Sequence, residues 1–259
     1  MRTVTATRYV TPLREGGSLP ALVEADDDGL YVLKFRGAGQ GCKALVAELL
    51  AGELARHLGL AVPQIVFMQL DPVLARTEPD PEIQDLIRAS GGLNLALDFL
   101  PGAVGFDPLA HAVEADWAST LVWFDALVCN VDRSARNTNL MWWHGRPWLI
   151  DHGAALVFHH QWSDPVEQAR RPFAAIREHV LLPRANTLAA AHERLSARLD
   201  LAVLAQIVDA IPDDWLRADT VLPDPAAQRA AYRSYFAARL ADAGCWLQPL
   251  LQAAEAARR

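Results

Sequence analysis

The chain changes character near residue 100, and this change limits the folds that it can adopt. Before the break at Pro101-Gly102, short runs typical of β-strands alternate with turn residues. After the break, long segments are rich in Ala, Leu and Arg, and their apolar residues recur at helical spacing. A strand-rich part followed by a helix-rich part predicts an α+β fold with two lobes, at residues 1–100 and 101–259.

The first lobe is predicted to contain an antiparallel meander and one main helix. Residues 43–58 place leucines at helical spacing and end before Gly59, so one apolar face of this helix is expected to pack on the sheet. A shorter helix is expected at residues 82–89. The predicted strands are residues 3–11, 19–24, 30–35, 62–70 and 93–100.

The second lobe is predicted to be larger and mainly helical. An amphipathic helix is expected at residues 116–130, followed by a hairpin with strands at 140–143 and 148–150. Two long helices are expected at 185–211 and 226–257. Six tryptophans of this half are expected to pack in the core and between the lobes: Trp117, Trp123, Trp142, Trp143, Trp148 and Trp162.

Charge and composition exclude some classes of partner. A formal charge of −7 over 259 residues argues against general nucleic-acid binding, which needs a concentrated basic surface. The sequence shows no signal peptide and no run long enough to span a bilayer, so we expect a cytoplasmic protein. The cysteines, expected to be reduced and in apolar surroundings, are Cys42, Cys129 and Cys245. The clustered histidines, which lack the spacing of a zinc site, are His144, His152, His159 and His160.

A single lysine stands in the predicted strand at residues 30–35. Strand alternation places Lys34 on the face opposite Leu33 and Phe35, where it points either to solvent or into a cleft. The following helix carries Glu48, and a strand lysine paired with a helix glutamate is the arrangement that kinases use to hold ATP phosphates. Glu53 is a competing partner on the same helix.

A polar loop follows the helix predicted at residues 116–130. Asp132 and Asn137 are separated by the interval that kinase catalytic loops show, in which the Asp accepts a hydroxyl proton and the Asn binds metal. The pattern alone has little specificity. The alternative is an Asx-rich turn in which Asn137 or Asn139 caps the backbone.

Two further segments complete the pattern. Asp151 closes the predicted hairpin and precedes His152-Gly153, as the metal-binding Asp of kinases precedes Phe-Gly, although a turn-forming Asp is the alternative. Gly16, Gly17 and Ser18 could place backbone N–H groups over phosphates, or could form a simple hairpin turn. In this order, the segments predict a phosphoryl-transfer site that uses ATP and Mg²⁺.

The same segments resemble the HipA-like kinase family from about residue 19 to residue 157. The resemblance implies a bilobal protein-kinase-like fold, with a small, mostly antiparallel first lobe and ATP with Mg²⁺ in the cleft. It further implies that Lys34 contacts the α- and β-phosphates, Glu48 orients it, Asp132 is the catalytic base, and Asn137 and Asp151 bind metal. The matching runs are Tyr31-Val32-Leu33-Lys34-Phe35, Ala47-Glu48-Leu49, Leu58-Gly59-Leu60-Ala61-Val62-Pro63, Asn130-Val131-Asp132-Arg133 with Asn137, and Ile150-Asp151-His152-Gly153.

Three hypotheses for function remain open at this point. The leading one is transfer of the γ-phosphoryl of ATP to a Ser or Thr hydroxyl of a protein partner. The second is a small-molecule kinase of the antibiotic or lipid type, which would use the same catalytic loop. The third is a pseudokinase that binds nucleotide or a small protein partner without turnover. Fold-level resemblance does not choose among acceptors.

Overall fold

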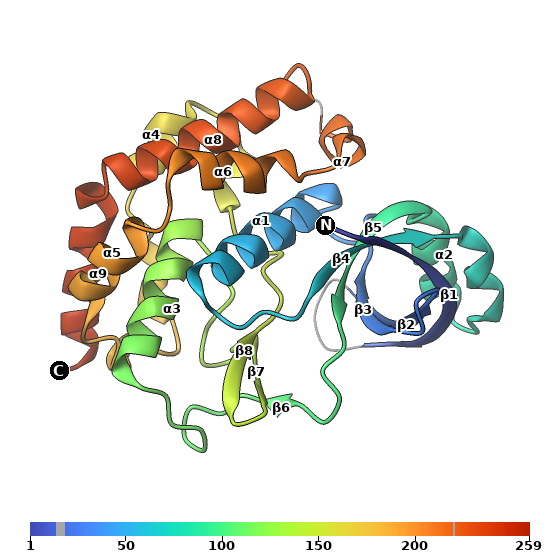
Figure 1. Ribbon diagram of the computed structural model, residues 1–259, viewed down its shortest axis with the longest axis horizontal. Coiled ribbons are helices and arrows are strands. Elements are labelled where there is room, and N and C mark those ends of the chain that lie inside the picture. The colour runs from blue at the N-terminus through green and yellow to red at the C-terminus, as the bar shows by residue number, and fades with distance from the viewer. Residues whose placement is uncertain (14–18, 220) are drawn as a thin grey trace.

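A computed structural model describes residues 1–13, 19–219 and 221–259 (Figure 1). It shows a small β-barrel lobe beside a larger helical lobe, with helix α1 (Cys42–Leu58) between them. The glycine-rich segment Gly16-Gly17-Ser18 lies outside the described residues, so its proposed role at the phosphates stays a prediction.

Five strands form a closed barrel in the order β1–β2–β3–β5–β4. Sequential neighbours pair antiparallel as expected, but β1 also pairs with β4 in parallel, which closes the sheet and was not foreseen. Alternate residues of each strand fill the barrel, among them Val23, Leu33 and Met68. The strands are β1 (Thr3–Pro12), β2 (Ala21–Ala25), β3 (Leu30–Lys34), β4 (Ile65–Leu70) and β5 (Gly92–Asp98); the 3-10 helix η1 (Pro72–Thr77) and helix α2 (Pro81–Ala89) connect β4 to β5.

Helix α1 is buried on almost every side, which corrects the expected single apolar face. Of its 17 residues, 11 are buried, and the helix ends where Gly59 adopts a left-handed conformation with φ of 89°. Gly52 lies so close to Ile65 of β4 that an added Cβ would overlap it. The other sides of α1 contact α6 (Leu201–Asp209) and α7 (Asp213–Arg217) of the helical lobe.

The helical lobe starts with a short antiparallel sheet and a long buried helix. Strand β6 (Val104–Gly105) pairs with the confirmed hairpin β7 (Leu140–Trp143) and β8 (Arg146–Leu149). Helix α3 (Ala115–Val128) leads into the polar loop that precedes β7. The remaining elements are η2 (Val157–His160), α4 (Pro165–Arg170), η3 (Ala174–Glu178), η4 (Leu182–Arg184), α5 (Leu188–Ser196), α8 (Pro225–Ala241) and α9 (Gly244–Ala257).

Both long helices predicted for this lobe are interrupted. The segment 185–211 divides into α5 and α6, because Asp200 accepts a hydrogen bond from Val203 N and starts a new helix. The segment 226–257 divides into α8 and α9 around Asp242. Hydrophobic periodicity continues through both breaks and therefore did not reveal them.

The largest hydrophobic core crosses between the lobes. It joins residues of α1, including Leu50 and Leu54, to Phe124 of α3 and Trp215 of α7. Trp215 is 1% exposed, its Nε1 donates to Leu93 O of β5 at 2.9 Å, and its ring meets Phe67 edge-on at 5.5 Å. The helical lobe is thus packed into the side of the barrel. The domain boundary at Pro101-Gly102 stays a prediction.

Two further expectations concern the surroundings of the cysteines and the absence of a membrane-spanning helix. All three cysteines are free, but Cys245 is exposed, so the expectation of apolar surroundings is wrong at that position. In the part of the chain that is described, none of the helices combines the length and hydrophobicity needed to cross a membrane. The cytoplasmic location stays a prediction.

We expect Trp215→Ala to lower the free energy of unfolding by about 3–5 kcal/mol, because it removes a large side chain from the shared core. Trp215→Phe is the matched control, since it keeps most of the packing and removes the hydrogen bond to Leu93 O. Urea unfolding of the three proteins would measure the difference. A loss below 1 kcal/mol in the Ala variant would contradict the role of Trp215.

Candidate active site

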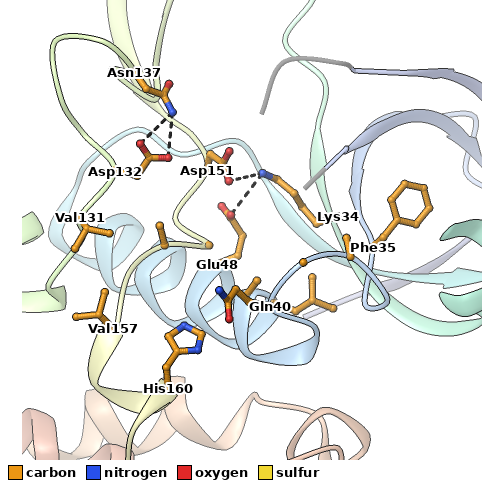
Figure 2. A pocket seen from close by; sticks show the side chains of 16 residues that line it. Lys34, Phe35, Gln40, Glu48, Val131, Asp132, Asn137, Asp151, Val157 and His160 are labelled. Carbon is orange, nitrogen blue, oxygen red and sulfur yellow. Dashed lines mark hydrogen bonds and ion pairs between the residues drawn. The ribbon is translucent and has the colours of Figure 1, made fainter. Parts of the chain in front are cut away.

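The predicted site residues line one cavity of about 500 Å³ (Figure 2). They come from four segments that are distant in sequence: the end of β3, the middle of α1, the loop between α3 and β7, and the turn after β8. The residues that meet there are Lys34, Glu48, Asp132, Asn137 and Asp151.

Lys34 points into this cavity and is not a solvated strand residue. Its side chain is 11% exposed, and Nζ lies 2.6 Å from Asp151 Oδ1 and 3.8 Å from Glu48 Oε2. Burial lowers the pKa of Lys34, but the negative charges of Glu48 and Asp151 outweigh it and leave the pKa above its ordinary value. Lys34 is therefore a fixed cation in the cavity.

Glu48 is the buried partner that holds Lys34. Burial raises the pKa of its carboxyl, but the charge of Lys34 and a hydrogen bond from His152 bring the pKa well below the usual range. His152 is itself buried, with Nδ1 3.3 Å from Glu48 Oε1. The competing candidate Glu53 pairs instead with Arg56, at 3.7 Å. The sequence showed His152 beside Asp151 but gave no indication of this contact.

Three asparagines fix the position of Asp132. Asn137 Nδ2 donates to both carboxylate oxygens, at 3.1 and 3.0 Å, and Asn139 Nδ2 donates to Oδ2 at 3.0 Å. Asn139 also donates to the Asp132 carbonyl at 2.7 Å, and Asn130 Oδ1 accepts from Asp132 N at 3.1 Å. The backbone-capping alternative is thus partly realised by Asn139, while Asn137 contacts the carboxylate.

Asp151 lies in a turn with a left-handed backbone. Strand β8 ends at Leu149, and Asp151 has φ of 55°, a left-handed conformation that Asp adopts more readily than most non-glycine residues. From this turn its carboxylate reaches Lys34, and the turn also places Gly153 on the cavity wall.

A buried ion cluster holds the polar loop between α3 and β7 in place. Asp125 of α3 is fully buried and its Oδ2 lies 2.5 Å from Arg133 Nε and 3.0 Å from His179 Nε2. Arg133 in turn donates from Nη1 to Asn139 O at 2.7 Å, and Asn130 Nδ2 donates to Asp125 Oδ1 at 3.0 Å. Local sequence patterns gave no prediction of this cluster. A carboxylate inside the apolar helix was the available signal, because such a group needs partners.

The pKa of Asp125 links this cluster to acid stability. Burial raises the pKa, but the charge of Arg133 and the hydrogen bond with His179 lower it to about 2. In the unfolded chain the value is about 3.9. The ionised carboxylate therefore stabilises the fold above about pH 4, and this contribution of roughly 2–3 kcal/mol is lost as the pH falls towards 2.

We expect Asp125→Asn to be less stable than the wild type at pH 5, and the gap in unfolding free energy to narrow by about 2 kcal/mol at pH 2.5. The narrowing follows because the Asp125 carboxyl of the unfolded wild type, with a pKa of about 3.9, takes up a proton over this range before the folded one does, and the amide does not titrate. Urea unfolding at both pH values measures the gap. Asp85→Asn on the exposed face of α2 is the control, and a pH-independent gap for Asp125→Asn would contradict the assignment.

The oxygen atoms in the cavity suit a divalent ion of the Mg²⁺ type. Magnesium prefers hard oxygen ligands and is commonly bound by one or two carboxylates together with substrate phosphates. Asp151 and the Asn137 amide oxygen provide such ligands beside the Lys34 cation. In the described ranges, no three His, Cys, Asp or Glu side chains are grouped so that they could hold a metal ion, so Asp151 and Asn137 would need substrate phosphates to complete the ligand set.

A small β-barrel lobe packed on a helical lobe, with a lysine–glutamate pair and an Asp, Asn, Asp set in the cavity, defines a protein of the kinase fold. The family model described as HipA-like kinase matches residues 7–237, and the chain belongs to this family. The predicted family and fold class are thereby confirmed. Membership and fold together support a phosphotransferase.

One solved structure shows the same fold at low sequence identity, and a second is less similar. The proinflammatory kinase CtkA of Helicobacter pylori superimposes with a TM-score of 0.61 at 12% identity, covering 96% of each chain. A Golgi casein kinase with Mn/ADP bound gives a TM-score of 0.49 at 13% identity, over 92% of this chain and 73% of that one. None of the curated proteins matches the chain.

Proposed function

We propose that this protein is an ATP- and Mg²⁺-dependent phosphotransferase that passes a γ-phosphoryl group to a hydroxyl, with a Ser or Thr of a protein partner as the acceptor. The observation that carries the proposal is the meeting of Lys34, Glu48, Asp132, Asn137 and Asp151 around one cavity. These are the residue types that phosphoryl transfer requires, and each is held by a named partner.

Each residue has a defined part in the reaction. Lys34, oriented by Glu48, would bind the phosphates that are not transferred. Asp132 would accept the proton of the acceptor hydroxyl while that oxygen bonds to the γ-phosphorus and the bond to the β-phosphate oxygen breaks. Asn137 and Asp151 would hold the metal. ATP supplies the phosphoryl group, and Mg²⁺ neutralises its charge.

The fixed orientation of the Asp132 carboxylate supports its proposed role as the catalytic base. Hydrogen bonds from Asn137 and Asn139 restrict the carboxylate to one orientation, so little reorganisation is needed when the acceptor arrives.

Two alternative functions share this site. A small-molecule kinase would use the same loop, and only the acceptor separates it from a protein kinase. A pseudokinase is less well supported, because both proposed metal ligands and the proposed base are present.

We expect calorimetric titration to show ATP binding that requires Mg²⁺ and weakens at least tenfold in Asp151→Ala. The reason is that this change removes a metal ligand and also leaves Lys34 with one fewer partner. Asp85→Ala, on the exposed face of α2, is the matched control and should bind as the wild type does. Absence of binding in the wild type, or unchanged binding in Asp151→Ala, would reject the proposed site.

We expect Asp132→Asn to lower kcat by about 10²–10⁴ while the ATP dissociation constant changes less than threefold. The amide keeps the shape of the side chain but cannot accept the hydroxyl proton. Transfer of labelled phosphate to protein, aminoglycoside, inositide and nucleoside acceptors gives the rate and separates the acceptor classes. A variant that keeps wild-type kcat would show that Asp132 is not the base.

A further inference from the structure

The cavity extends beyond the groups that would bind phosphate. In Figure 2, Val131 and Val157 lie on the opposite side of the cavity from Lys34 and Phe35. Val131 directly precedes Asp132, and both valines lie on the same side of Lys34 as this proposed base. This part of the cavity is not needed for the phosphates and is a candidate for recognition of the acceptor.

The two valines are exposed although they are apolar. Val131 is 46% exposed and Val157 is 38% exposed, and both line the cavity. Their backbone is nevertheless fixed. Leu156 N donates to Val128 O at 2.8 Å, which ties the segment before Val157 to the end of α3, close to Val131. This backbone contact holds together the two segments that carry the valines.

The lining of the cavity carries more negative than positive charge. The charged groups among the described lining residues are Lys34 and the three carboxylates that surround the phosphate site. Burial, followed by the charge of Lys43, lowers the pKa of His160 on the valine side, and Lys43 is itself paired with Asp219 at 3.0 Å. An anionic acceptor would be repelled by the carboxylates, and a charged neighbour packed on the valines would lose hydration.

Resting on the proposed function, we propose that Val131 and Val157 form an acceptor subsite that selects a Ser or Thr with an aliphatic neighbour in a protein chain. The exposure of both valines leaves them open to an extended chain, whereas a small alcohol would need enclosure to gain the same contact. Specificity arises because an aliphatic neighbour is desolvated favourably and a charged neighbour is not.

The test compares Ser and Thr peptides with Leu, Lys or Glu beside the acceptor, phosphorylated by the full chain with Mg²⁺ and ATP. We expect kcat/KM to be at least tenfold higher with the Leu neighbour. The double variant Val131→Thr with Val157→Thr, which keeps side-chain shape but adds hydroxyls, should reduce this preference at least fivefold. The control Val104→Asp, at an exposed valine of β6, should keep it.

Calorimetry on the same proteins separates this inference from the proposed function. Failure of the wild type to bind Mg²⁺ and ATP would reject both. Binding together with equal use of the three peptides, transfer to none of them, or transfer only to an aminoglycoside or an inositide would overturn the subsite alone. Retention of the Leu preference by a double variant that binds ATP within twofold of wild type would also overturn it.

Discussion

The burial of one carboxylate, that of Glu48, determines how the parts of this protein must fit together. An ionised group in the interior is costly unless charged and hydrogen-bonding partners compensate for its lost hydration. Glu48 has two such partners, Lys34 from the barrel and His152 from the turn after β8. The barrel, α1 and the turn after β8 in the helical lobe therefore have to be in place together.

Contacts at both ends of α1 hold this helix in place between the lobes. Near its start, Lys43 Nζ lies 3.0 Å from Asp219 Oδ2, and at its end Arg198 Nη1 donates to Leu58 O at 2.8 Å. The side chain of Trp215 packs between α1 and the barrel. Because all three partners belong to the helical lobe, α1 cannot move with the barrel alone without losing these contacts. A second buried cluster, around Asp125, holds the loop of Asp132 in the same lobe.

The strands and main helix of the first lobe, the hairpin and the family were predictable because they depend on local patterns. Asp132 and Asn137 were found for the same reason, since five positions in one loop keep them near each other in any fold of the loop. The helix breaks at Asp200 and Asp242 were missed, because periodicity continues across them. The Asp125 cluster was missed because its partner His179 is 54 residues away along the chain.

The order of amino acids sets which chemical groups the protein has and which of them are neighbours along the chain. The contacts between distant segments place Lys34 in the cavity and pair it with Glu48 and not with Glu53. The physical reason is that strand alternation and helical spacing fix a side chain's face but not what covers that face. The packing of α1 between the two lobes determines that Glu48 faces Lys34, and it thereby forms the lysine–glutamate pair of the cavity.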